Sequence, residues 1–299
     1  GYTFEAATIA KFVMSDVYQE FDQSRSRERK MAMLDAAGLI VDKIKKGVDP
    51  VKLASALASS AHRKRIQVWM RDEAPQRAVA ALGVSGSFRP AASGTTMIGV
   101  VTQNAGANKL DYYLRREIDI QIRLREDGSA SAAVKVTLRN SAPASGLTRE
   151  VMGPANVPDG EVLYRAGRNV SFLNVYLPAA AARAEWSEAG KPVGTEIQAA
   201  PDALIVSRFI DVAPGGSAET TLTFELPAGS WDEGRVRLLV PRQPAAAADA
   251  LTVRIFPPEG LTAGGSDQFE VSKMMNRDIL VETHIGRPWT DRLKQLVWR

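Results

Sequence analysis

One segment, residues 104–116, gathers polar, charged and aromatic side chains where a loop leads into a strand. It reads Asn-Ala-Gly-Ala-Asn-Lys-Leu-Asp-Tyr-Tyr-Leu-Arg-Arg. Loops held by a rigid scaffold carry function more often than core segments do. Basic side chains can bind an anionic sugar or a phosphate, amides can add hydrogen bonds, and an aromatic ring can stack on a sugar. The residues that would build such a site are Asn104, Asn108, Lys109, Tyr112 or Tyr113, Arg115 and Arg116.

The same segment also has a structural interpretation, in which it joins two domains. Gly106 would then allow a tight backbone bend, Asp111 and Arg115 would form an ion pair, and the two tyrosines would pack between the domains. The string contains no known catalytic motif. The sequence therefore leaves both interpretations of the segment open.

A second candidate is a basic cluster near the start of a predicted helix, formed by Arg25, Arg27, Arg29 and Lys30. Positive charges are unfavourable near a helix N-terminus, where the helix dipole is itself positive. The cluster is therefore either a binding site for an anionic ligand or a solvated helix start.

Composition limits the chemistry that remains. The 299-residue chain has no cysteine and only two histidines, so disulfides, thiolate zinc sites and multi-histidine metal sites are excluded. One group of carboxylates, Asp16, Glu20 and Asp22, could hold a divalent cation such as Mg²⁺ together with a phosphate, and its alternative is a solvated helix face. We expect no cofactor beyond such a cation.

Positive charge is concentrated at the front of the chain. Residues 1–110 contain 16 Lys and Arg against 10 Asp and Glu, whereas the other 189 residues contain 22 against 24. This balance favours an anionic partner or a solvated helix face. The run His62-Arg63-Lys64-Arg65 falls at a predicted helix C-terminus, where the dipole favours cations, and it has no interleaved aromatics. No nucleic-acid partner is expected.

Capping residues predict four helices within residues 1–90. Their boundaries are set by Thr3, an interruption at 22–26, Gly47, Asp49-Pro50, Asp72 and Gly83. The apolar run Ile66–Met70 is predicted as a short strand, which makes this front piece helical with a β element.

Beyond residue 97 the chain is predicted to be almost entirely β. Apolar residues alternate with polar ones in 118–124 and in 132–138. A three-residue loop over 126–128, with Gly128 left-handed, pairs Ile120 with Val134 and keeps both apolar sets on one face. The further strands are predicted at 170–177, 204–212, 218–226, 236–240, 251–256, 269–271 and 279–285.

These elements predict an α+β protein, with a helical α/β domain over residues 1–105 and an antiparallel, immunoglobulin-like β-sandwich over 106–288. Residues 289–299 are expected to form a C-terminal tail or a short helix. No run of about 18 apolar residues is present, so no transmembrane helix is expected inside the chain. Residues 1–10 do not have the pattern of a signal peptide.

The string Val-Thr-Gln-Asn-Ala-Gly-Ala-Asn-Lys-Leu-Asp-Tyr-Tyr-Leu-Arg-Arg at 101–116 resembles the actinobacterial domain-of-unknown-function family four-zero-one-two. The resemblance extends to Ser15–Tyr18, to the turn Met152-Gly153-Pro154, and to the segment 251–260 with its Phe-Pro-Pro-Glu-Gly ending. It implies an extracytoplasmic, cell-envelope protein that is anchored in the membrane through an N-terminal half not included in this sequence.

Residues 3–44 resemble, more distantly, the C-terminal part of LytR-CpsA-Psr proteins, which transfer lipid-linked glycopolymers onto peptidoglycan. That family places an Asp before two helical arginines that contact the lipid pyrophosphate. The matching positions are Asp22, Arg25 and Arg29, and Lys30 stands where the family has Gln. The resemblance implies a relative of these phosphotransferases that handles a cell-envelope glycopolymer or a lipid-linked glycan.

Three functions remain open at this stage. The first is glycopolymer handling, with a basic cleft lined by Arg25, Arg29 and Lys109. The second is a non-catalytic binding or scaffolding module of the envelope. The third is a glycosidase with paired carboxylates, for which the sequence offers no pair at productive spacing.

Overall fold

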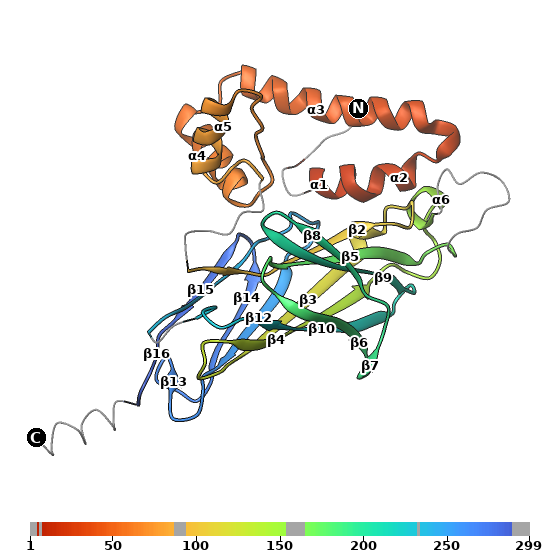
Figure 1. The fold of residues 1–299 in the computed structure, drawn as a ribbon. Coiled ribbons are helices and arrows are strands. Elements are labelled where there is room, and N and C mark those ends of the chain that lie inside the picture. Colours follow the sequence, from red (N-terminus) through yellow and green to blue (C-terminus); the bar gives the residue numbers. More distant parts are fainter. Residues whose placement is uncertain (1–4, 6–7, 87–93, 154–164, 232–233, 289–299) are drawn as a thin grey trace, which may run out of the picture.

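The computed structural model describes residue 5 and residues 8–86, 94–153, 165–231 and 234–288. The protein combines helices with a larger, mainly antiparallel β part. Figure 1 shows most of the helices gathered on one side of the β part, with α6 at its edge beside α2. The predicted tail at 289–299 lies outside the described residues.

The helical part begins with one helical segment that contains a π-helical turn. Its components are α1 (Ile9–Lys11), a π-helix (Phe12–Asp16) and α2 (Val17–Glu20), and a 3₁₀ turn (Gln23–Arg25) then leads into α3 (Ser26–Lys45). The helices α4 (Pro50–His62), α5 (Glu73–Ala81) and α6 (Arg149–Met152) follow along the chain. The predicted cap of α4 is confirmed, since the Asp49 carboxylate accepts hydrogen bonds from the amides of Val51 and Lys52.

The strand predicted at Ile66–Met70 does not form. The segment is an irregular link between α4 and α5, held by a hydrogen bond from the Val68 amide to the Val84 carbonyl. Trp69 within it is 74% exposed. The residues have strand propensity, but none of the described strands pairs with them, and a strand needs a partner for its backbone groups.

The described residues of the β part form four sheets. The largest has seven strands in the order β14-β12-β3-β4-β10-β6-β7, and the others are β2-β5-β9-β8, β1-β11-β15 and β13-β16. Most neighbours are antiparallel, whereas β12 with β3 and β1 with β11 are parallel. β1 and β2, which precede residue 106, pair with β11 and β5.

The strands occur in numerical order along the chain. They are β1 Thr96–Met97, β2 Gly99–Asn104, β3 Leu114–Leu124, β4 Ala130–Asn140, β5 Asn169–Pro178, β6 Ala182–Glu188, β7 Lys191–Pro192, β8 Glu196–Ala200, β9 Ala203–Val212, β10 Ser217–Leu226, β11 Val236–Val240, β12 Asp249–Phe256, β13 Thr262–Ala263, β14 Phe269–Met275, β15 Ile279–Thr283 and β16 Ile285–Gly286. A short 3₁₀ helix, Leu110–Tyr113, precedes β3.

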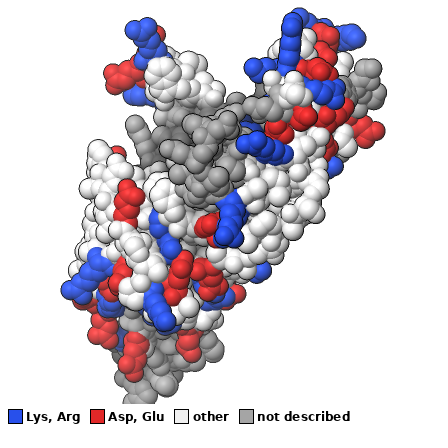
Figure 2. Space-filling model, turned by 90° about the vertical axis from the view of Figure 1, so that its right-hand side faces the viewer, with Lys and Arg blue, Asp and Glu red and all other residues white. Residues whose placement is uncertain are grey.

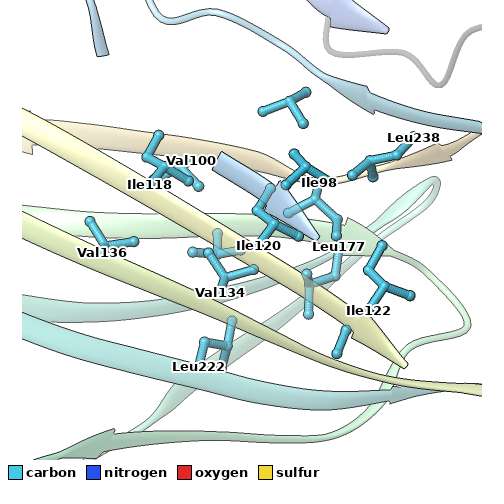
Figure 3. Packing of buried hydrophobic residues seen from close by; sticks show 14 of the residues in the cluster. Ile98, Val100, Ile118, Ile120, Ile122, Val134, Val136, Leu177, Leu222 and Leu238 are labelled. Carbon is cyan, nitrogen blue, oxygen red and sulfur yellow. The ribbon is translucent and has the colours of Figure 1, made fainter. Parts of the chain in front are cut away.

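The predicted hairpin register is confirmed. Ile120 pairs with Val134, the amide of Arg125 donates to the carbonyl of Ser129, and Gly128 has φ 78°. The alternating side chains of β3 and β4 therefore point to one face, where they are buried. In Figure 3 they pack against side chains of β2, β5 and β11, so one face of the seven-stranded sheet forms the core with the smaller sheets. This burial of apolar surface is the main stabilising term.

Two contacts join the helical part to the β part at the end of α4. The Arg242 guanidinium, on the loop after β11, donates to the carbonyl of Arg63, and the Lys64 ammonium pairs with Asp278 at 3.0 Å. On the other side, the Thr148 hydroxyl donates to the carbonyl of Tyr18 in α2 at 2.7 Å. In the part of the chain that the structure describes, no helix combines the length and the apolar character needed to cross a bilayer.

Candidate functional site

The loop at the start of the 104–116 segment is held by two asparagine side chains. The Asn104 amide donates to the Asn108 side-chain carbonyl at 2.9 Å, and its own carbonyl accepts from the amide of Gly106. Asn108 also accepts from the amide of Leu110 and donates to the carbonyl of Arg168 at 3.0 Å. Because Asn108 is 9% exposed, these amides serve the loop itself. They fix the position of the neighbouring Lys109.

Gly106 is not the residue that makes the bend. The left-handed conformation belongs to Ala107, which has φ 47°. Gly106 is instead required for packing, since a Cβ there would lie 2.5 Å from the Asn108 amide nitrogen. The loop therefore contains one strained alanine, and strain of this kind persists only where the surroundings enforce it.

Gly153 closes over the same loop, and replacing it tests how tightly the loop is held. It has φ 64°, and a Cβ would lie 2.6 Å from the Asn108 Cβ and 3.2 Å from two backbone carbonyls. We expect Gly153→Ala to lower the free energy of unfolding by about 2–4 kcal/mol, from backbone strain plus overlap. Urea unfolding measures the change.

Gly146→Ala is the matched control, because Gly146 has φ 89° but nothing within 4 Å of a built Cβ. Strain alone should cost about 1–2 kcal/mol there. Equal losses for the two variants would contradict the proposed packing of Gly153 on Asn108.

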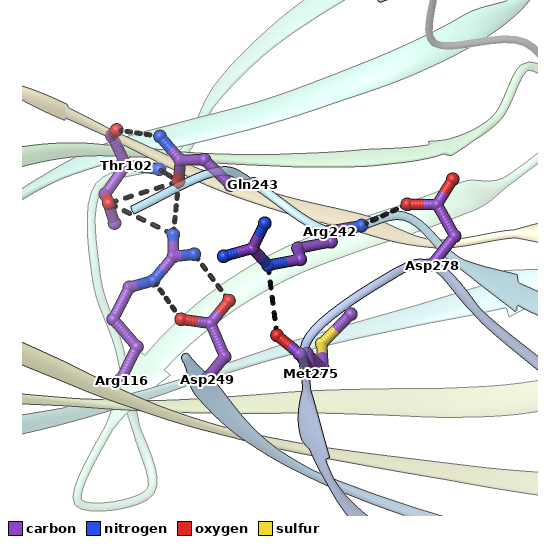
Figure 4. A network of polar contacts seen from close by, with 7 residues as sticks. All are labelled: Thr102, Arg116, Arg242, Gln243, Asp249, Met275 and Asp278. Carbon is purple, nitrogen blue, oxygen red and sulfur yellow. Dashed lines mark hydrogen bonds and ion pairs between the residues drawn. The ribbon is translucent and has the colours of Figure 1, made fainter. Parts of the chain in front are cut away.

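Arg116 lies inside the protein. Its guanidinium pairs through two hydrogen bonds with Asp249 at the start of β12, at 2.8 and 2.5 Å, and donates to Thr102 and Gln243 (Figure 4). The side chains of Arg116 and Asp249 are 2% and 4% exposed. Four of the five N–H donors of Arg116 are thus used inside the protein, where they join β3 to β2, to β12 and to Gln243, which makes Arg116 a structural residue.

Arg115 and its neighbours are at the surface. The Arg115 guanidinium donates to the carbonyls of Tyr112 and Leu114, both at 3.0 Å. Asp111 accepts from the Asn169 amide at 3.2 Å, and no ion pair joins it to Arg115. Tyr112 packs edge-on against Tyr113, with ring centroids 5.2 Å apart. Arg115 is left exposed, without a carboxylate partner in the described chain.

The structure brings Lys109 together with Arg29 of α3. The Lys109 Nζ lies 5.3 Å from the centroid of the Tyr18 ring, and the Arg29 Cζ lies 5.2 Å from the same centroid. The two cations are therefore at most about 10.5 Å apart. Neither has a carboxylate partner within the described residues; Arg29 donates to the carbonyl of Phe21 at 3.1 Å. We call this group, Tyr18, Arg29 and Lys109, the Tyr18 site.

Arg25 and Asp22 border the Tyr18 site without joining it. Arg25 stacks over Phe21 at 4.7 Å and pairs with Glu28 at 2.5 Å, and that hydrogen bond is the main cause that raises the pKa of Arg25. The Asp22 carboxylate accepts from the Ser24 hydroxyl and from the amide of Arg25, and the Ser24 bond is the larger cause that lowers its pKa. Asp22 therefore stabilises the turn at neutral pH, and this contribution is lost as the pH falls through its lowered pKa.

Tyr18 is the functional candidate that the charge pattern alone does not single out. Its side chain packs both against the Phe12–Ala32 cluster of the front helices and against the cluster of Leu110, Ala142 and Val151. Beside it, Ser15 and Gln19 form hydrogen bonds with the Tyr113 hydroxyl at 3.3 and 3.2 Å. The available sequence signal was an aromatic residue seven positions before the basic cluster that begins at Arg25.

The carboxylates that were considered for a cation do not converge. Asp16 pairs with Lys11 at 3.2 Å, and Asp22 is engaged in its own turn. Over the described residues, no three Asp, Glu or His side chains form a group suited to a metal ion. The view in Figure 2, from the side of α2 and α6, shows basic and acidic side chains mixed across the surface rather than one large patch of a single sign. Local geometry, rather than net charge, distinguishes the Tyr18 site.

No protein-family model and no curated protein matches the sequence. Among solved structures, the protein is similar to a candidate nutrient-binding protein of Legionella pneumophila, with TM-score 0.39, 7% identity and coverage of 63% of this chain and 71% of that chain. It is also similar to yeast LTA4 hydrolase in complex with bestatin, with TM-score 0.33, 9% identity and coverage of 57% of this chain and 28% of that chain. A third similar structure is an M1 zinc metallopeptidase of Deinococcus radiodurans, with TM-score 0.27, 15% identity and coverage of 58% of this chain and 39% of that chain. These scores are too low to support any argument about function.

Proposed function

We propose that this protein belongs to the cell envelope and binds the pyrophosphoryl group of a lipid-linked glycan at the Tyr18 site during glycopolymer assembly or attachment. The observation that carries the proposal is the placement of Arg29 and Lys109 on one aromatic ring, although they come from segments 80 residues apart in the sequence. A ring that attracts both cations holds them near each other without neutralising either charge.

The chemistry of the two cations suits a pyrophosphate. Arginine offers a planar fork of donors for phosphate oxygens, and lysine adds a mobile point charge. Arg29 uses one nitrogen on the Phe21 carbonyl, which orients the guanidinium and leaves further donors. Arg25, one helical turn earlier, is already paired with Glu28, so we assign it a peripheral role.

Other parts of the proposal rest on the resemblance of residues 101–116 and 3–44 to envelope families. They are an extracytoplasmic location, a membrane anchor in an N-terminal half outside this sequence, and contacts between that half and the Tyr18 site. The immunoglobulin-like character of the β part also belongs to the proposal. The mainly antiparallel sheets are compatible with it, and the parallel pairing of β12 with β3 is a departure from it.

Binding of a short polyprenyl pyrophosphate, measured by calorimetry, tests the proposal. Arg29→Ala and Lys109→Ala should each weaken binding about tenfold or more, because a hydrogen bond between charged groups is worth roughly 1.5–3 kcal/mol. Arg29→Lys should keep part of the affinity. The corresponding polyprenyl alcohol, which lacks phosphate, should bind poorly to every variant.

Arg77→Ala is the matched control, since Arg77 is an exposed helical arginine paired with Glu73 outside the Tyr18 site. It should bind like the unmodified protein. If Arg29→Ala and Lys109→Ala also bind like the unmodified protein, or if none of the proteins binds, the proposed function is wrong.

The second candidate function is a non-catalytic binding or scaffolding module of the envelope. One observation favours this candidate. Asp22 is the one carboxylate in the phosphotransferase resemblance, and its oxygens accept hydrogen bonds within its own turn, so it serves the turn rather than a reaction. Adding a glycan acceptor to the bound complex separates the candidates. If the protein binds the lipid-linked glycan but does not transfer the glycan to the acceptor, it is a binding module. Transfer of the glycan to the acceptor identifies it as a relative of the phosphotransferases.

A further inference from the structure

The outer face of the seven-stranded sheet carries a hollow of about 310 Å³ far along the strands from the 104–116 segment. It is lined by Gln121 and Arg123 of β3, Ser131, Ala132 and Ala133 of β4, Arg183 of β6, and Thr223, Phe224 and Glu225 of β10. The pairing sets the outward side chains in two rows, Arg123–Ser131–Glu225 and Gln121–Ala133–Thr223. Small side chains in the middle of these rows form the floor, and longer ones form the walls.

Arg183 is aimed by a defect in the strand pairing. Thr223 of β10 pairs with Glu185 of β6, and Glu225 pairs with Ala182. The step of two residues along β10 is thus matched by three along β6, so β6 has one extra residue there. Arg183 lies within this bulge and has φ 53°, a left-handed conformation that disfavours side chains. Bulges redirect side chains, and they are common beside binding sites. Here the bulge directs Arg183 into the hollow.

Arg123 forms the opposite wall. Its guanidinium stacks over the Phe256 ring of β12, with the Cζ 4.1 Å from the centroid, which holds it in place. β3 and β6 are separated by β4 and β10, so the two walls stand about 14 Å apart at the level of the backbone, from three strand spacings of roughly 4.8 Å. Long arginine side chains leave room between them for one sugar-sized group.

Both guanidiniums lack a carboxylate partner in the described chain, unlike their neighbours. On the same face, Arg125 pairs with Glu225, Lys135 with Glu219, Arg139 with Glu117, and Arg254 with Asp119 and Glu270. The carboxylate that lines the hollow, Glu225, is therefore already neutralised at 2.6 Å by Arg125. The hollow thus holds two uncompensated positive charges above hydroxyl and amide groups.

We propose that this hollow, the Arg123–Arg183 groove, binds an anionic saccharide unit. The two arginines recognise the oxyanion, either a carboxylate or a phosphate, from opposite walls. Gln121, Ser131 and Thr223 provide donors and acceptors for sugar hydroxyls. The groove shares no residue with the Tyr18 site, so this proposal can be tested separately from the proposed function.

Titration with glucuronic acid, followed by NMR on the full chain, tests the groove, with glucose as the neutral probe and glucose 6-phosphate as the phosphorylated one. Shifts should appear at residues that line the groove, and glucose should bind at least about tenfold more weakly than the better anionic sugar. Comparison of the two anions identifies the preferred oxyanion. Equal binding of glucose and both anions would overturn the proposal.

Arg183→Ala and Arg123→Ala should each weaken the preferred anion about tenfold, whereas Lys135→Ala, which removes a paired cation on the same face, should not. Arg29→Ala should leave this binding unchanged, which separates the groove from the Tyr18 site. Thermal unfolding checks that each variant is folded. Arg123→Lys keeps the positive charge at this position, so it shows whether the charge alone, without the stacked guanidinium, supports binding. Unchanged affinity in both alanine variants, or absence of binding in the unmodified protein, would show that the groove is not a saccharide site.

Discussion

Asp249→Ala is expected to lower the free energy of unfolding by about 3–5 kcal/mol, the usual cost of leaving a buried charge without its partner. Arg116 and Asp249 are almost completely buried and joined by two hydrogen bonds. Without the carboxylate, the guanidinium keeps only Thr102 and Gln243, which are neutral. Urea unfolding followed by circular dichroism measures the loss.

The double variant Arg116→Met with Asp249→Leu is the informative companion. Replacing both members of a buried pair by apolar residues of similar size is often neutral or stabilising. We therefore expect the double variant to recover most of the stability that Asp249→Ala loses. Glu117→Ala is the control, because Glu117 and Arg139 form an exposed pair, and it should cost about 1 kcal/mol or less. A loss for Asp249→Ala as small as that of Glu117→Ala would contradict the structural role of Arg116.

The sequence predicted well where local patterns determine the structure. The hairpin of β3 and β4 is an example, since alternation and a left-handed Gly128 fix both its faces and its loop. The cap at Asp49 is another, because the carboxylate bonds to amides two and three residues away. Both depend on neighbours in the sequence, and so both could be predicted from it.

Prediction failed where the local pattern is weak, or where the structure depends on partners that are distant in the sequence. β6 and β8 were missed because Ala182–Glu188 begins in an alanine run and Glu196–Ala200 is exposed along most of its length, so neither shows a clear alternation. The prediction for Ile66–Met70 failed in the opposite way, since its composition favours a strand but no strand among the described residues pairs with it.

The residues of the candidate site show the same contrast between what local sequence predicts and what distant partners determine. The sequence identified Arg29 and Lys109 as separate candidates, but the ring of Tyr18 that brings them together became visible only in three dimensions. Arg116 was grouped with the ligand-binding residues because its partner, Asp249, lies 133 residues away in the sequence. A dense polar segment thus contains two kinds of residue. Asn104, Asn108 and Arg116 build the junction, and Lys109 and Arg115 remain at its surface.

Trp186→Ala is expected to lower the free energy of unfolding by about 3–5 kcal/mol, because it removes the largest fully buried side chain among the described residues and leaves a cavity. Trp186 lies on β6, where it pairs with Leu222 of β10. It anchors the strand that carries Arg183, so its loss should also weaken the Arg123–Arg183 groove. Urea unfolding measures the change, and Trp69→Ala, at a tryptophan that is 74% exposed, should stay within about 0.5 kcal/mol of the unmodified protein.

Trp186→Phe separates the cavity from the polar group of the indole. The Trp186 Nε1 is buried and has no hydrogen-bond partner among the described residues, so phenylalanine removes a donor that costs free energy to bury. We expect Trp186→Phe to cost less than half of what Trp186→Ala costs, because a second aromatic ring refills most of the space. Equal costs for the two substitutions would show that the loss does not follow the volume removed, and the cavity explanation would be wrong. A cost for Trp186→Ala no larger than that of Trp69→Ala would place Trp186 outside the core.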